Sequence, residues 1–377
     1  MYIKMPYNWD LSLLDSLDKM NREDDTIYPV KEIYASDRKS IVGTGRPPAV
    51  IPERHESYAT HINSSHKKGM KFFYVLNACS MAGQELNGDT QKEIYTHISD
   101  LVEAGVDGFI ITIPYLAVLI KTWFPKLIIA SSVNNQLDSV AKIEQLLYSA
   151  PYDEIQFPFT RSRDFPLFRE VSNHFPEKGR TALVNESCLP DCAFQRFHQD
   201  FYNFLSPEEK KIDFYHLCCA VHKLENPLNV LKSQWIRPED LCFLKEAGIT
   251  AVKLAGREKK DSSWLLDLAR NYSKGQSTGN IFRFVEKTGL LDMDWKDILG
   301  KDLDPCHYIV DSQAMDGFIK PFYDGKVPCV TNKNCSADCK WCEGFMHAVT
   351  LPPNRSERLN TVNQLMEVAK SNMYKVV

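Results

Sequence analysis

Short runs of apolar, branched and aromatic residues alternate along most of the chain with stretches of helical periodicity. Lys71–Leu76 (KFFYVL) and Gly108–Ile113 (GFIITI) are the clearest apolar runs. The strands predicted from such runs are Val30–Tyr34, Lys71–Leu76, Gly108–Ile113, Lys126–Ala130, Glu154–Phe157, Thr181–Val184, Lys232–Ile236 and Thr250–Leu254. The predicted helices are Glu93–Ala104, Leu116–Trp123, Asp138–Ser149, Asp164–Asn173, Pro238–Ala247 and Ser262–Asn271. Strands this apolar are buried on both faces, which is typical of a parallel sheet covered by helices.

About eight such units suit a closed, TIM-like (β/α)8 barrel, and the predicted fold class is therefore α/β. An open, doubly wound sheet is the alternative, but no G-x-G-x-x-G follows the first predicted strand. We expect an N-terminal segment at residues 1–29, the barrel at 30–278 and a C-terminal extension at 279–377. The extension contains a small Cys-rich segment, residues 329–342.

Composition and charge narrow the functional classes. The formal net charge of the 377 residues is −4, which makes a nucleic acid partner unlikely by charge alone. No apolar run approaches the ~18 residues that a membrane-spanning helix needs, and the start of the chain lacks an export signal. We therefore expect a cytoplasmic protein without membrane segments. Its eleven cysteines then indicate metal ligation or catalysis rather than disulfide bonds.

The first cysteine motif is Asn185-Glu-Ser-Cys-Leu-Pro-Asp-Cys192, which follows a predicted strand. Cys188 and Cys192 are close enough on one loop to bind the same metal centre. Further ligands would come from Cys219 or its neighbour Cys218, and from Cys79 after the Lys71–Leu76 strand. The alternative is that these cysteines are small buried apolar residues, and for Cys79 this is as plausible as ligation.

The second motif is the Cys-rich segment, in which Cys329, Cys335, Cys339 and Cys342 lie within fourteen residues. The polar residues between them cannot form a core of their own, so a shared metal would supply the stability. Four thiolates suit either a 4Fe-4S cluster or zinc. The last three cysteines have the spacing of a radical-SAM loop, but that loop opens a barrel near the N-terminus, whereas this segment lies near the end of the chain.

A third motif supplies cations. Lys253 and Arg257 flank the end of a predicted strand, and Arg237 precedes the helix before it. At the rim of a barrel these side chains suit a carboxylate or phosphate of the substrate. Ion pairs with Glu239 or Asp240 are the alternative.

Together, the Asn185–Cys192 stretch, Ile236-Arg-Pro-Glu-Asp and Lys253-Leu-Ala-Gly-Arg257 resemble the collagenase-like peptidases of family U32. Ile41-Val-Gly-Thr-Gly-Arg46 is similar but less specific. The resemblance implies a barrel-like fold and, in several branches, a 4Fe-4S cluster held by four cysteines. Those branches include oxygen-independent hydroxylases that act on RNA bases or on a ubiquinone precursor. Cys188, Cys192 and one of Cys218 and Cys219 fall where the cluster ligands of the family would be.

The chain departs from that pattern by the short spacing of its first cysteines and by the added Cys-rich segment. It also lacks G-x-S-x-G and H-E-x-x-H protease motifs. The leading hypothesis is an iron–sulfur redox enzyme, with one or two clusters, that modifies or hydroxylates a small molecule, peptide or base with an anionic group. A partner protein or electron donor would serve it. The alternatives are a peptidase, with Cys188 or Cys192 as nucleophile and His198 or His216 as base, and a non-catalytic iron–sulfur partner subunit.

Overall fold

Eight parallel strands close into a barrel in the computed structural model, each strand pairing with its neighbours in chain order. The structure describes residues 1–46, 48–189, 192–201, 213–277, 279–285, 308–327, 329, 335 and 339–371. β8 closes the ring by pairing with both β7 and β1. The predicted TIM-like (β/α)8 class is confirmed.

The bounds of the elements agree with most of the predicted ranges. The strands are β1 (Tyr2–Pro6), β2 (Val30–Ala35), β3 (Lys71–Leu76), β4 (Gly108–Ile111), β5 (Ile128–Ser131), β6 (Glu154–Gln156), β7 (Gly179–Leu183) and β8 (Ala251–Lys253). The helices that follow them are α1 (Leu11–Asn21), α2 (Tyr58–Lys67), α3 (Gly88–Glu103), α4 (Pro114–Trp123), α5 (Val140–Ser149), α6 (Phe165–His174), α10 (Leu241–Glu246) and α11 (Ser262–Lys274). Three more helices, α7 (Gln195–Phe201), α8 (Phe214–Glu225) and α9 (Leu228–Lys232), connect β7 to α10.

The two faces of each strand have different environments. Ile3 and Met5 of β1 are buried in the main core between the strands and the helices. A separate cluster that includes Phe73, Val75 and Ile110 fills part of the barrel interior. The interior also holds charged residues, because Lys4 of β1 forms ion pairs with Glu32 of β2 and Glu154 of β6.

The structure corrects two of the predicted ranges. Residues 1–29 are not a segment outside the barrel, since they contain β1 and α1. Lys232–Ile236 is not a strand. Lys232 ends α9, and the next residues run beneath that helix, where the Trp235 indole N–H donates to the Val230 carbonyl at 2.8 Å. The count of eight strands is therefore right, but β1 replaces the predicted seventh strand.

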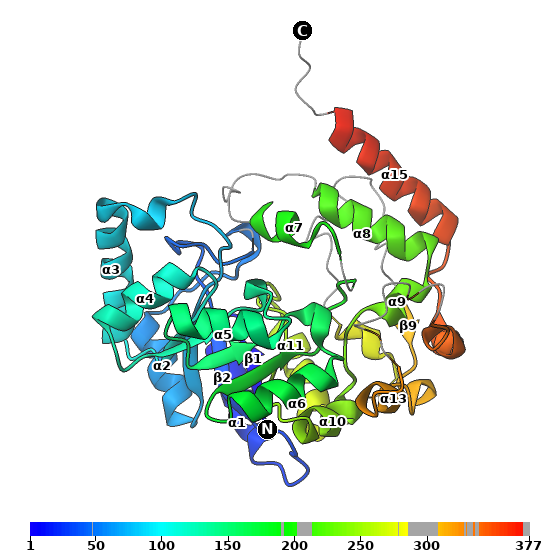
Figure 1. Ribbon diagram of the computed structural model, residues 1–377, viewed down its shortest axis with the longest axis horizontal. Helices are drawn as coiled ribbons and strands as arrows, with labels where there is room; N and C mark the ends of the chain where they lie inside the picture. Colours follow the sequence, from blue (N-terminus) through cyan, green and yellow to red (C-terminus); the bar gives the residue numbers. More distant parts are fainter. Residues whose placement is uncertain are drawn as a thin grey trace.

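The long connection between β7 and β8 covers one end of the barrel. In Figure 1, α7 and α8 lie above the strands, and the C-terminal helix α15 (Arg355–Ser371) runs along α8. Leu217 and Leu224 of α8 pack there against Val362 and Leu365 of α15. Within the C-terminal extension, β9 (Ile309–Val310) pairs with β10 (Val349–Thr350), and α13 (Lys320–Tyr323) lies between them in sequence. None of the helices in the described ranges is long and apolar enough to span a membrane.

Candidate functional site

The loop after β7 carries the first cysteine motif to the C-terminal mouth of the barrel, where barrels of this kind place their sites. Asn185 fixes this loop to the end of β8. Its side-chain oxygen accepts from the Ala255 amide at 2.6 Å, and its amide group donates to the carbonyl oxygens of Ala255 and Phe284. Asn185 is fully buried. The residue therefore holds the two motif-bearing loops together, which accounts for its place at the start of the motif.

The loop after β8 holds Arg257 rigidly. Its guanidinium donates to the Ser36 hydroxyl at 2.7 Å and to the Thr44 carbonyl at 2.8 Å. The preceding Gly256 has a φ of +131°, a region that side chains other than glycine rarely adopt. A Cβ there would lie 3.0 Å from the Trp264 ring. The Lys-x-x-Gly-Arg element thus needs its glycine to place the arginine.

The Ile41–Arg46 stretch closes over the same mouth. Gly45 has a φ of +64°, and a Cβ there would lie 3.1 Å from the Asn77 carbonyl oxygen at the end of β3. The next residue, Arg46, forms an ion pair with Glu258 at 3.5 Å. The motif therefore adds a second guanidinium beside the first.

These loops enclose a cavity of about 450 Å³ above the barrel interior, the mouth cavity. Its lining includes both cation motifs and the first cysteine motif, with Cys188, Cys192, Cys219, Arg46, Lys253 and Arg257 among the residues. The structure brings Cys219 of α8, rather than Cys218, to the cavity. Predicted site residues from the loop after β7, from α8 and from the loop after β8 thus gather around one space.

The three thiols lie close enough to affect one another. Burial raises the pKa of Cys188 well above its usual value, and the nearby Glu186, Cys219 and Cys192 add to the rise. Burial also raises the pKa of Cys192. A thiol nucleophile needs the opposite shift, whereas a metal centre would compensate the charge of several thiolates at once. These buried thiols therefore need a nearby positive charge to ionise.

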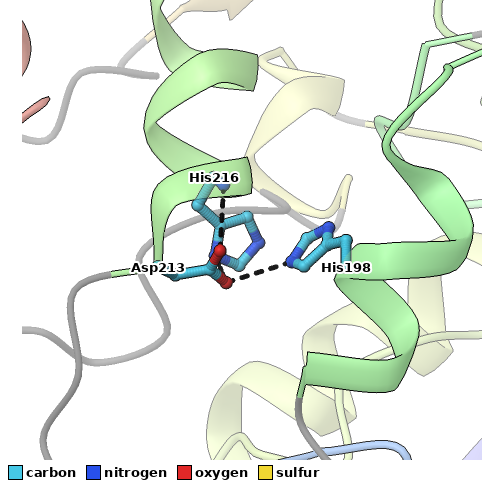
Figure 2. Close-up of side chains that lie close together, drawn as sticks. All are labelled: His198, Asp213 and His216. Carbon is cyan, nitrogen blue, oxygen red and sulfur yellow. Dashed lines mark hydrogen bonds and ion pairs between the residues drawn. The ribbon is translucent and has the colours of Figure 1, made fainter. Parts of the chain in front are cut away.

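The two histidines proposed as bases contact a carboxylate instead of a thiol. Figure 2 shows His198 of α7 and His216 of α8 close together beside Asp213, and their ring centres are 4.1 Å apart. The Asp213 carboxylate lies 3.1 Å from His198 Nε2 and 2.8 Å from His216 Nδ1, and it also caps α8. Burial would raise the pKa of Asp213, but hydrogen bonds to the two imidazoles outweigh it and lower that pKa.

Among the described residues, this group alone brings three metal-ligand atoms within 4.8 Å of one another. Two histidines and a carboxylate are a common ligand set of zinc and of non-haem iron. In the described part of the chain no three cysteine sulfurs lie that close. A tetrahedral zinc ion would separate its sulfurs by only about 3.8 Å. The wider spacing of the thiols suits a group larger than a single ion.

Two predicted site residues do not line the mouth cavity. Cys79 lines a neighbouring cavity with Cys192 and Asn134, and both of these residues also line the mouth cavity. Arg237 does not line the mouth cavity. Both of its terminal nitrogens and its Nε are engaged, since it pairs with Asp240 at 2.7 Å and with Asp316 at 2.9 Å. The pair with Asp316 joins the barrel to the C-terminal extension, so the structure places Arg237 in an ion-pair network and not on the mouth cavity, and its role in substrate binding stays a prediction.

The Cys-rich segment lies against the barrel, although its residues 330–334 and 336–338 are outside the described ranges. Cys342 is buried, and the Cys329 sulfur accepts from the Gln234 side-chain amide at 3.6 Å. Burial raises the pKa of the Cys342 thiol to about 12, and Arg163 opposes the rise. The four thiols of the segment are near enough to influence one another electrostatically.

Arg163 gives this segment an unusual neighbour. Its buried guanidinium donates to the carbonyl oxygens of Leu231 and Trp235 and lies over the Phe318 ring, but it forms no ion pair with a carboxylate of the described residues. A buried cation without an anion is costly. The roles of Arg163, Glu186 and Asp213 could not be predicted from the sequence, because residues that surround each of them come from other segments of the chain.

The chain as a whole can be compared with known proteins. No family model matches the chain. A curated relative named an uncharacterized protease, from Methanocaldococcus jannaschii, is 26% identical over 310 residues, which are 80% of this chain and 84% of the relative.

Among solved structures, a U32 peptidase is 13% identical to this chain, with a TM-score of 0.45. The match covers 63% of this chain and 88% of that peptidase. An uncharacterized B. cereus protein is 10% identical, with a TM-score of 0.34, and covers 74% of this chain and 65% of its own. Over four fifths of its length the chain is thus similar to a protein named a protease, in line with the resemblance that its motifs indicated.

Proposed function

We propose that this chain is a redox enzyme whose iron–sulfur cluster is held by Cys188, Cys192 and Cys219. Its substrate would be a small molecule, peptide or base with an anionic group. The observation that carries the proposal is the shared cavity, which three thiols and two guanidinium groups line together. Bound there, a cluster would exchange electrons with the substrate, and three protein ligands would leave one iron accessible.

In the proposed enzyme, residues of the chain bind and orient the substrate. Arg257, held by Ser36 and Thr44, presents a fixed charge to a carboxylate or phosphate, and Arg46 adds a second. Tyr34, Phe159 and Leu183 supply apolar contacts to the body of the substrate. An external electron donor, such as a partner protein, would complete the redox cycle.

Alkylation with and without chelator tests the cluster assignment. In oxygen-protected protein, Cys188 and Cys192 should resist iodoacetamide until iron is removed, and then both should react. Fast labelling of either cysteine before iron removal would reject the assignment and favour a thiolate nucleophile. Exposed Cys242 serves as the internal control, since it should react equally in both samples.

Arg257→Lys tests the binding of an anionic group. Lysine keeps the charge but cannot hold Ser36 and Thr44 while facing a carboxylate. Loss of such charge-assisted hydrogen bonds costs about 1.5–3 kcal/mol, so affinity should fall about 10- to 100-fold. The affinity is measured as the thermal stabilisation of the protein by a panel of small carboxylates. Arg283→Lys, at an exposed ion pair with Asp267, is the matched control. Equal stabilisation of both variants would make Arg257 structural.

A second metal centre is proposed for Cys329, Cys335, Cys339 and Cys342. Four thiolates around Zn²⁺ carry a net charge of −2, and a four-iron cluster is likewise anionic. Arg163 is buried and forms no ion pair with a carboxylate of the described residues. An anionic metal centre nearby would supply the negative charge that balances its guanidinium. The choice between iron and zinc is left to metal analysis.

Cys339→Ser should lower the metal content of this segment and expose the C-terminal extension to protease, because the metal would provide its stability. Metal analysis and limited proteolysis measure both effects. Cys242→Ser, at an exposed cysteine outside the segment, should change neither. Unchanged metal stoichiometry in Cys339→Ser would contradict the second centre.

A zinc peptidase is the second candidate, and the His198–Asp213–His216 group favours it. Catalytic zinc in proteases has three such ligands and an open position. His198 lines the mouth cavity, and the curated relative is named a protease. The zinc peptidase would be supported over the redox enzyme if the protein hydrolyses peptides and binds one zinc ion per chain. Asp213→Asn should then abolish both the zinc binding and the hydrolysis.

A further inference from the structure

Two lysines inside the barrel have opposite surroundings. Lys4 of β1 and Lys253 of β8 are paired in register on adjacent strands, and both are buried. Lys4 forms ion pairs with Glu32 and Glu154. Lys253 forms none with the described residues. Its amine donates to the Gln156 side-chain oxygen at 3.0 Å and lies 4.5 Å from the centre of the Tyr34 ring. One lysine is therefore neutralised by acids and the other is not.

The charged groups around Lys253 disfavour its protonation. Burial lowers the pKa of Lys253 well below its usual value, and the cations Arg257, Lys4 and Arg46 lower it further. Glu32 opposes them, but its carboxylate is already paired with Lys4 at 3.0 Å. Desolvation beside other cations favours the neutral form of an amine, and a neutral amine is a nucleophile.

The Lys253 amine lies where barrels of this kind place their reacting groups, at the C-terminal end of a strand. Lys253 ends β8 and lines the mouth cavity, where its neighbours Arg46 and Arg257 can hold an anionic substituent. The amide nitrogen of Gln156 is buried and donates to no acceptor in the described structure, although the oxygen of the same amide accepts from Lys253. This buried N–H group belongs to the side chain that accepts from the Lys253 amine, and the described residues supply no acceptor for it.

We propose that Lys253 forms an imine with the carbonyl group of an anionic aldehyde or ketone, such as a 2-oxo acid. The amine nitrogen adds to the carbonyl carbon to give a carbinolamine. The carbinolamine then loses its oxygen as water, which takes both amine protons, and no oxidant or reductant is consumed. The imine can take up a proton and withdraw electrons from the adjacent carbon. The inference shares the anion-binding cavity with the proposed function but does not rest on its metal centre.

Reductive trapping tests the imine in the full-length protein. Glyoxylate, the smallest anionic aldehyde of this kind, is added at pH 7 with sodium cyanoborohydride, and the modified lysines are mapped by mass spectrometry. We expect Lys253 to be carboxymethylated at least ~10-fold faster than the exposed Lys92, because each unit of lowered pKa raises the neutral fraction tenfold. The buried Lys4 is the matched control and should remain unmodified.

Two comparisons make the result decisive. Acetaldehyde lacks the carboxylate, so the rate at Lys253 relative to that at the exposed Lys92 should be several-fold lower with acetaldehyde than with glyoxylate. Chelator-treated, iron-free protein should be trapped as fast as untreated protein, so failure of the cluster proposal would leave this result intact. Trapping at Lys253 that is absent, or no faster than at Lys92, would overturn the inference. Lys253→Arg should abolish the adduct, but the wild-type map decides the question even if that variant does not fold.

Discussion

Replacing Cys188, Cys192 or Cys219 singly with alanine is expected to remove most of the bound iron and of the visible absorption near ~400 nm. Each thiolate would hold one corner of a shared centre, so the loss of any one loosens the whole. The three residues come from the loop after β7 and from α8, and their side chains line one cavity. Iron analysis and spectra of anaerobically prepared variants measure the effect, which should be similar for all three.

Cys218→Ala is the closest control, because Cys218 is the neighbour of Cys219 on α8 but does not line the cavity among its described residues. That variant should keep its iron and its spectrum. A different pattern would refute the shared centre: if only one of the three variants loses function and all keep their metal content, the cysteine concerned is a nucleophile and not a ligand.

The fold was largely predictable because most strands are apolar on both faces. β1 escaped prediction because Lys4 interrupts Tyr2–Pro6 and hides its alternation. Ile3 and Met5 face the helices, whereas Lys4 faces the barrel interior. A charged residue at such a position is tolerated only through Glu32 and Glu154, which come from other strands. Local pattern alone could not reveal that compensation.

The candidate site was predictable where its residues follow strands. Parallel strands end at the same mouth, and the structure places Cys188 and Arg257, which follow β7 and β8, on one cavity. Cys219 could not be distinguished from Cys218, because the orientation of α8 depends on its packing against α15. His198 and His216 were noted as bases, but their common partner Asp213 emerges only when α7 and α8 meet.

Lys4→Met is expected to destabilise the protein by about 3–5 kcal/mol, because it leaves buried carboxylates without their cation. The Lys4 side chain is fully buried, and those of Glu32 and Glu154 are 2% and 13% exposed. Chemical denaturation measures the change. Lys31→Met is the matched control, since Lys31 is an exposed residue of the neighbouring β2 and its loss should stay within ~0.5 kcal/mol.

The destabilisation by Lys4→Met should also grow with pH. Burial already raises the pKa of Glu32 to about 7 in the parent protein, while Lys4 opposes that rise. Without Lys4 the folded-state pKa rises further above the unfolded value of ~4.3, so the folded variant holds protons that the unfolded chain releases. Its stability must then fall as pH increases through this range. We expect a larger loss at pH 8 than at pH 5, and an equal loss at both would show that packing, rather than charge, makes Lys4 necessary.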